Sequence, residues 1–279
     1  MAVQSKSVAD TLKKKSGAGS SFTGFAGRRL PIDRRLLSAA SVLVVLAIWQ
    51  WGAGHVSGFI LPAPGDVLGR FLDPKWLTRV ASAFGQSLVQ LGLGFGLTLL
   101  VAVPLGIVIG RSRVLTRMFE PVINAIYAIP PVAFVPFLII WFGLFLQARI
   151  ALVFLMSVFD VLVIMISGSR DVRKSLLDVG RSFDASHSQR LRLIVFPALM
   201  PFLFAALRVG SARAINGMIT AELFFAAVNL GAIMKRATQN FDSATVLAVV
   251  LLICLLGLAA QSAINALERH LLHWHVRPA

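Results

Sequence analysis

The stretch SRDVRKSLLDVGRSFDASHSQRLRLIVFP, residues 169–197, is a polar and basic segment between two long apolar runs. Almost everything around it is apolar enough to face lipid, so this segment can present a folded surface to a partner in water. We therefore expect the function to depend on this segment and on the two helices that it joins.

Within this segment the residue pattern predicts a helix, a turn and a second helix at a membrane surface. Residues 176–183 are compatible with one short helix, and residues 184–186, Asp-Ala-Ser, favour a break followed by a new helix cap. Residues 190–196 then lead into Pro197 and the next apolar run.

The composition places the chain among integral membrane proteins. Hydrophobic residues make up 57% of the 279 residues and charged residues only 14%. Several apolar stretches approach the roughly 20 residues that a helix needs to cross a bilayer. We predict an all-α, polytopic protein with six spans and no additional catalytic domain. The predicted spans are residues 36–52, 86–110, 121–143, 150–168, 198–226 and 244–267.

The distribution of basic residues predicts the orientation. With the N-terminus inside, nineteen Lys and Arg residues fall on the cytoplasmic side and six on the outside, as the positive-inside rule requires. Residues 1–35 then form a flexible basic tail, not a cleaved signal peptide, and residues 269–279 a second cytoplasmic tail. Residues 36–268 form the membrane domain, with the loop 169–197 in the cytoplasm.

The third predicted span is interrupted by prolines, at Pro130, Pro131 and Pro136. Each proline lacks a backbone donor and crowds the preceding turn, so the helix must bend or break. Broken helices in membranes are tolerated where they are enclosed by protein or face a water-filled cavity. Asn124 and Tyr127, three residues apart just before the prolines, point toward the same region.

Charged residues inside the spans supply the remaining pathway candidates. A carboxylate in lipid is costly, so Glu222 should face a cavity, a partner or the membrane boundary, where it could simply close a helix end. Arg213 could attract an anion, whereas Asp160 is interpreted as a hydrogen-bonding partner of a neighbouring helix. The predicted pathway residues are Asn124, Tyr127, Pro130, Pro131, Arg213 and Glu222.

Other functional classes find little support in the sequence. The single cysteine, Cys254, lies in an apolar run, and His270, His273 and His275 near Trp274 favour an interfacial anchor over a metal site. No G-x-x-x-x-G-K-[ST] motif is present, so this chain is not expected to hydrolyse ATP. An ion-gradient-driven transporter or channel is the alternative, but it would be favoured by paired carboxylates or inverted repeats.

The predicted cytoplasmic loop resembles the EAA loop of permease subunits of ATP-binding-cassette importers. The family pattern is Glu-Ala-Ala, three residues, Gly, nine residues, Ile, two residues, Pro. The matching positions here are Asp178, Val179, Gly180, Asp184, Ile194 and Pro197. The sequence departs from this pattern: Asp178 replaces Glu, Gly180 replaces the second Ala, and Asp184 replaces a turn Gly, which Asp can imitate less readily.

Further matches, in the correct order, resemble the nitrate, sulfonate and taurine branch of this family. They are residues 59–64 (FILPAP), 129–136 (IPPVAFVP), 141–143 (WFG) and 221–222 (AE). This resemblance implies a type I, MetI-like permease fold in a bacterial inner membrane. It also implies a small solute such as a sulfonate, taurine or nitrate as the cargo.

The resemblance implies partners as well as a fold. These are two cytoplasmic ATPase subunits that bind ATP and Mg²⁺, a second copy of the permease and a periplasmic or extracellular solute-binding protein. No cofactor is expected in this chain. The residues implied in coupling to the ATPase are Leu177, Asp178, Val179, Gly180, Arg181, Asp184, Ala185, Ser186, Ile194 and Pro197.

Overall fold

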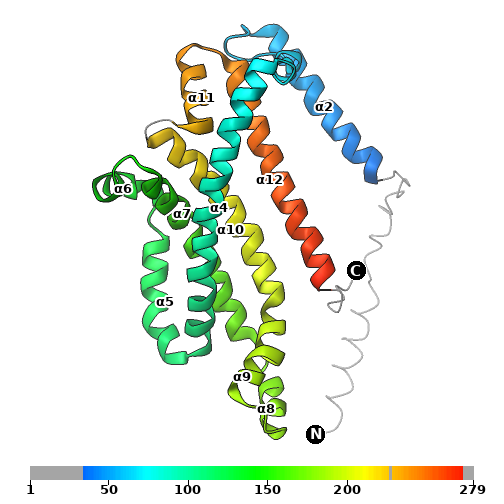
Figure 1. The fold of residues 1–279 in the computed structure, drawn as a ribbon. Coiled ribbons are helices and arrows are strands. Elements are labelled where there is room, and N and C mark those ends of the chain that lie inside the picture. Colours follow the sequence, from blue (N-terminus) through cyan, green and yellow to red (C-terminus); the bar gives the residue numbers. More distant parts are fainter. Residues whose placement is uncertain (1–33, 226–227, 273–279) are drawn as a thin grey trace, which may run out of the picture. The chain divides into compact units, whose positions relative to one another are not determined.

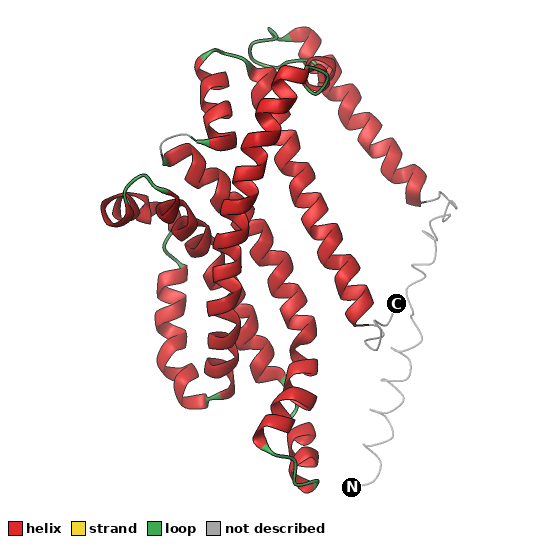
Figure 2. Cartoon of the chain, in the orientation of Figure 1, coloured by secondary structure: helices red, strands yellow, loops and turns green. Residues whose placement is uncertain are grey.

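The computed structural model describes residues 34–225 and 228–272, and the described part of the chain is helical, as predicted (Figures 1 and 2). Two units are distinguished, residues 1–48 and residues 49–279, and their boundary falls inside helix α2 (Arg34–His55). The first unit contributes only the start of α2 to the description. Most of the predicted N-terminal tail, and residues 273–279 of the C-terminal tail, lie outside the described residues.

Within residues 34–225 and 228–272, four helical segments are long and apolar enough to cross a membrane. They are α4 (Pro74–Arg111), α7 (Leu146–Asp171), α12 (Ser243–Leu271) and the continuous run of α9 (His187–Arg190), the π-helical turn η2 (Leu191–Val195) and α10 (Phe196–Phe224). These four correspond to predicted spans. The apolar part of α2, Ala40–His55, is shorter than a spanning helix usually is.

The predicted third span is broken, as its prolines required. It consists of α5 (Arg113–Tyr127), a 3₁₀ turn η1 (Pro131–Phe134) and α6 (Val135–Phe142), and the two parts are bent by 84°. The break falls just before Pro131, and Pro136 lies in the first turn of α6, where a missing backbone donor costs nothing. The bent pair counts as a fifth span only if both parts belong to one crossing.

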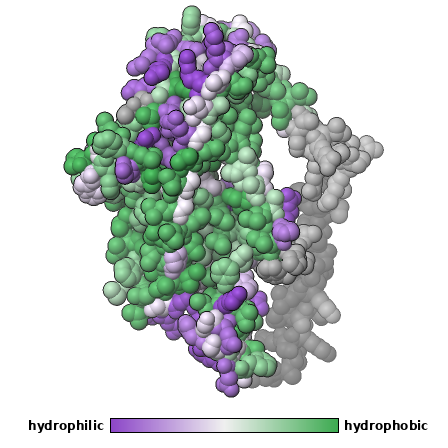
Figure 3. Space-filling view, viewed as in Figure 1, coloured by the Kyte–Doolittle hydropathy of each residue, from purple (hydrophilic) through white to green (hydrophobic). Residues whose placement is uncertain are grey.

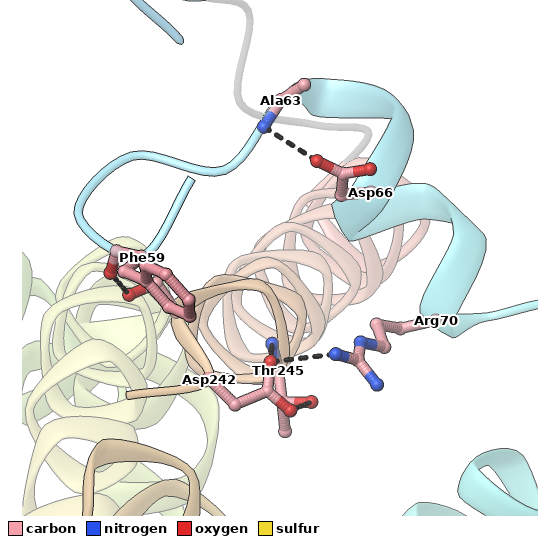
Figure 4. Close-up of polar contacts among 7 residues, drawn as sticks. Phe59, Ala63, Asp66, Arg70, Asp242 and Thr245 are labelled. Atoms are coloured by element: carbon pink, nitrogen blue, oxygen red, sulfur yellow. Dashed lines mark hydrogen bonds and ion pairs between the residues drawn. The ribbon is translucent and has the colours of Figure 1, made fainter. Parts of the chain in front are cut away.

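Short polar side chains begin several helices. Asp73 accepts a hydrogen bond from the Lys75 amide at 2.9 Å at the start of α4, ahead of Pro74 in the first turn. In the same way, the Ala63 amide donates to Asp66 Oδ2 at 3.2 Å at the start of α3 (Pro64–Arg70) (Figure 4). These caps fix where the helices start at the end of the second unit opposite residues 174–190.

Helices α4, α7 and α10 pack against one another in the core of the second unit (Figure 1). Glycines on α4 permit the close approach: an added Cβ at Gly94 would lie 2.6 Å from Val153, and one at Gly106 would lie 2.5 Å from Met165. Gly92 and Gly96 face open space. Gly94 and Gly106 therefore serve helix packing within the chain.

The surface polarity agrees with a membrane protein. On the face seen in Figure 3, hydrophobic residues cover the middle of the second unit and hydrophilic residues gather toward its two ends. One of these ends carries α8 (Lys174–Ser182) and α9, and the other carries α3 and the turn between α11 (Asn229–Gln239) and α12. Polar surface at both ends is what a helix bundle needs to face water on two sides of a bilayer.

Candidate coupling segment and translocation pathway

The turn after α8 is a Schellman motif with aspartate at its left-handed position. The Ala185 amide donates to the Gly180 carbonyl at 3.0 Å, and the Asp184 amide donates to the Arg181 carbonyl at 2.9 Å. Asp184 has φ of 50°, a value that usually favours glycine. This explains why the related pattern has glycine here, and it shows that aspartate adopts the left-handed conformation at this position.

Ser186 begins the second helix of the segment, as the sequence predicted. Its hydroxyl accepts from the Gln189 amide at 3.2 Å, and the Gln189 side chain accepts from the Ser186 amide at 2.8 Å. This reciprocal capping box starts α9, which continues through the π-helical turn into α10. The segment is therefore joined to the membrane helix without a flexible linker.

Helix α8 packs directly on the start of this run. An added Cβ at Gly180 would lie 2.7 Å from Ile194 Cδ1, so α8 lies close to Ile194 here, and a larger residue would require the end of the Ile194 side chain to shift. Leu177 packs against the buried side chains of Val172 and Val195. The opposite face of α8 is exposed, with Val179 at 55% exposure. The result is a compact knob, formed by α8 and α9, with an outward face.

The ten predicted coupling residues thus divide between the inside and the outside of this knob. Leu177, Gly180 and Ile194 form its packing, while Ala185 and Pro197 are half-buried. The residues that reach the surface are Asp178, Val179, Arg181, Asp184 and Ser186. Asp178 and Arg181 form an exposed ion pair at 3.0 Å.

A second candidate site is a cavity of about 590 Å³ in the second unit, between α5, η1, α7 and α10. Three predicted pathway residues, Tyr127, Pro131 and Arg213, line it. Asp160 on α7 lines it as well. The apolar part of its wall consists of Ile126, Ile129, Phe134, Leu155, Met156 and Phe159.

Asp160 joins the two polar members of this cavity. The Tyr127 hydroxyl donates to Asp160 Oδ1 at 3.0 Å, and Arg213 Nε lies 3.4 Å from Asp160 Oδ2. The sequence interpretation of Asp160 as a partner of a neighbouring helix is confirmed, but it did not include Asp160 in the pathway set. An arginine and a carboxylate in two different spans were the available signal, because charges of opposite sign within a membrane usually pair.

The other three predicted pathway residues lie elsewhere. Asn124 is exposed on α5, and neither Asn124 nor Pro130 lines the cavity. Glu222 is fully buried near the end of α10 and faces polar partners, one of the three surroundings expected for it. The pathway role of these three residues stays a prediction.

Glu222 ties together three helices. Its carboxyl group accepts from the Ser87 hydroxyl on α4 at 2.5 Å, from the Asn229 side chain at 3.3 Å and from the Gly231 amide at 3.1 Å. The last two donors belong to the first turn of α11, so Glu222 satisfies the start of that helix. An added Cβ at Gly231 would lie 2.6 Å from the Glu222 backbone, which shows how closely the two helices approach.

The motif at residues 59–64 lies beside the start of α12, at the end of the second unit opposite α8 (Figures 1 and 4). The Ser243 hydroxyl donates to the Phe59 carbonyl. Arg70 forms an ion pair with Asp242 at 2.8 Å, and Asp242 also accepts from the Thr245 amide at 3.1 Å, capping α12. This corner is held by polar contacts between segments far apart in the sequence.

Residues 102–273 match the family described as binding-protein-dependent transport system inner membrane component. This chain belongs to that family. The match covers more than half of the chain, including the segment 169–197 and the cavity, so the family resemblance drawn from the loop is confirmed.

Individual relatives agree with this assignment. The taurine transport system permease protein TauC of Escherichia coli (strain K12) is 27% identical over 260 residues, covering 88% of this chain and 93% of TauC. The bicarbonate transport system permease protein CmpB of Synechococcus elongatus is 29% identical over 255 residues, covering 86% of this chain and 91% of CmpB. The relatives thus bear out the predicted branch.

A solved structure supports the fold alone. A chain of the MetNI methionine ABC transporter, in inward-facing conformations, superposes with a TM-score of 0.58 at 19% identity. The match covers 71% of this chain and 98% of that chain. The predicted MetI-like fold is therefore confirmed, while the number of spans in the described residues stands at four or five.

Family membership settles the general role of the chain. It is a multi-pass inner membrane protein and the permease component of an ABC transporter, whose ATPase is a separate subunit and which works with a binding protein. Among the described residues, no group of three or more His, Cys, Asp and Glu side chains could hold a metal ion. Of the three C-terminal histidines, His273 and His275 lie outside the described residues.

Proposed function

We propose that this permease and a second copy of it form the translocation path of an ATP-driven importer for a small solute. Two cytoplasmic ATPase subunits would dock on the segment 169–197, one on each copy. The observation that carries this proposal is the compact knob formed by α8 and α9. It is packed through Gly180 and Ile194, and it continues directly into α10, which lines the cavity with Arg213.

The proposed topology has six spans per copy, with α2 as the first and the bent pair of α5 and α6 as the third. The distribution of Lys and Arg supports a cytoplasmic location for both termini, including the tails 1–35 and 269–279, and for the knob. The corner around Phe59 and Asp242 then lies on the periplasmic side, where a solute-binding protein would deliver its ligand (Figure 4).

The cavity lined by Tyr127, Asp160 and Arg213 is proposed as part of the path. Its wall is mostly apolar with a few polar groups, which is typical of sites that hold small molecules. The names of the relatives include both taurine and bicarbonate, so we propose a sulfonate, taurine, nitrate or a similar small solute as the cargo.

The ATPase contact can be tested with Val179→Glu, because the Val179 side chain is exposed on the outer face of α8. We expect this variant to insert and fold but to lose the ATPase during co-purification. Leu68→Glu is the matched control, since Leu68 is similarly exposed on α3 at the opposite end. Equal recovery of the ATPase with both variants would contradict the docking proposal. Uptake into liposomes that lack the ATPase would contradict ATP-driven import.

A further inference from the structure

Helix α5 is held in place by one narrow stripe of side chains. Spacings of four, three and four residues place the members of this stripe on one helix face. They are Thr116, Glu120, Ile123 and Tyr127. Only Thr116 and Ile123 of this helix are buried, and most of its other apolar side chains are exposed, so its core packing is slight. Polar contacts therefore contribute to the orientation of α5.

The polar contact that links α5 to the end of α7 is the ion pair between Glu120 and Arg170. Arg170 donates from Nη1 to Glu120 Oε1 at 3.1 Å and from Nη2 to Oε2. Two parallel hydrogen bonds of this kind fix orientation as well as distance. Arg170 lies in the last turn of α7, four residues before α8 begins at Lys174. A displacement of the segment 169–197 would therefore reach α5 through this pair.

At the C-terminal end of α5, the same helix face reaches the cavity that is proposed as part of the path. Tyr127 follows Glu120 by seven residues, which corresponds to about 10 Å along the helix. Its hydroxyl contacts Asp160 in the cavity. Another cavity, of about 740 Å³, lies at the N-terminal end of α5, and its wall includes Glu120, Arg170 and the α8 residue Leu177. Helix α5 thus connects the knob with the path.

We propose that Glu120 and Arg170 are positioning residues for transport: their ion pair holds α5 so that movement of α8 is passed to Tyr127 at the cavity. The inference rests on the proposed function. The Arg170 and Glu120 side chains are 40% and 44% exposed, and exposed pairs contribute little to stability. Loss of this pair should therefore impair coupling while leaving the folded complex intact.

The test uses the complete complex with its ATPase in liposomes and needs no identified cargo. In a Cys254→Ala background, Ile129→Cys places one thiol at the cavity, where Ile129 is 43% exposed. Labelling by a charged maleimide is compared without nucleotide and after trapping with ATP and vanadate. We expect the labelling rate to change by about fivefold or more when coupling is intact.

Glu120→Gln should abolish this change while ATP hydrolysis continues. The combined exchange Glu120→Arg with Arg170→Glu should restore it, because the pair is rebuilt with reversed charges. Arg70→Gln, which breaks a pair of similar exposure at the opposite end, should leave the change intact. A full change in Glu120→Gln, or no recovery in the exchange, would overturn the inference. No change in the protein with native Glu120 would instead overturn the proposed function.

Discussion

Two carboxyl groups within the apolar helices, Glu222 and Asp160, have opposite surroundings. Glu222 on α10 is fully buried and receives hydrogen bonds from Ser87, Asn229 and the Gly231 amide. The Asp160 side chain on α7 is 10% exposed, lines a cavity and contacts a phenol and a guanidinium. Both residues present the same sequence signal, an acidic residue in a span.

The partners decide what each group can do. The donors around Glu222 belong to closely packed helices, so their hydrogen bonds hold those helices together. A cation at a cavity wall, such as the 54% exposed Arg213, can exchange its partner for a solute or for water. We therefore expect Glu222 to act mainly on assembly and Asp160 mainly on transport.

The largest expected effect is on stability, from Glu222→Ala. This change leaves the buried Gly231 amide without its acceptor, at a cost of about 3 kcal/mol. The melting temperature of the purified permease in detergent should fall clearly. Glu222→Gln, which retains one acceptor oxygen, should lower it less. If Glu222→Ala melted at the same temperature as the unsubstituted protein, the distinction drawn between Glu222 and Asp160 would be wrong.

The second expected effect is on transport, from Asp160→Asn. The substitution keeps the shape of the side chain but removes the charge that faces Arg213. Uptake of the solute that the binding protein delivers should fall about tenfold, which corresponds to a free-energy difference of about 1.4 kcal/mol. The melting temperature should change little, because the carboxylate and the amide that replaces it can both face the cavity. A large loss of stability with normal uptake would show that Asp160 serves assembly and not transport.

Local features of this fold could be predicted from sequence, whereas contacts between distant segments could not. The break at Pro130 and Pro131 and the cap at Ser186 follow from backbone chemistry within a few residues. The surroundings of Glu222 depend on Ser87, 135 residues away, and those of Asp160 depend on how α5 and α10 pack. No local pattern contains that information.

Tyr127→Phe changes the cavity less than Asp160→Asn does. It removes only the hydroxyl that donates to Asp160, while the ring keeps its packing. Losing one such hydrogen bond corresponds to about 1 kcal/mol, so uptake should fall by a factor of about five. Vesicle uptake and melting should be measured on the same preparation. A melting temperature that falls as far as in Glu222→Ala would show that Tyr127 serves assembly instead.

The smallest expected effect compares two buried serines. Ser87→Ala removes a donor to the Glu222 carboxyl group, and Ser157→Ala removes a hydroxyl that bonds the Thr98 hydroxyl at 2.8 Å. Both side chains are fully buried, so the two substitutions create similar losses of volume. Without Ser157, Thr98 still donates to the Gly94 carbonyl, whereas without Ser87 the Glu222 Oε1 atom keeps only the Asn229 side chain at 3.3 Å, so Ser87→Ala should cost about 1 kcal/mol more. Equal melting temperatures for the two variants would mean that the carboxyl group at Glu222 gains nothing special from its hydroxyl donor.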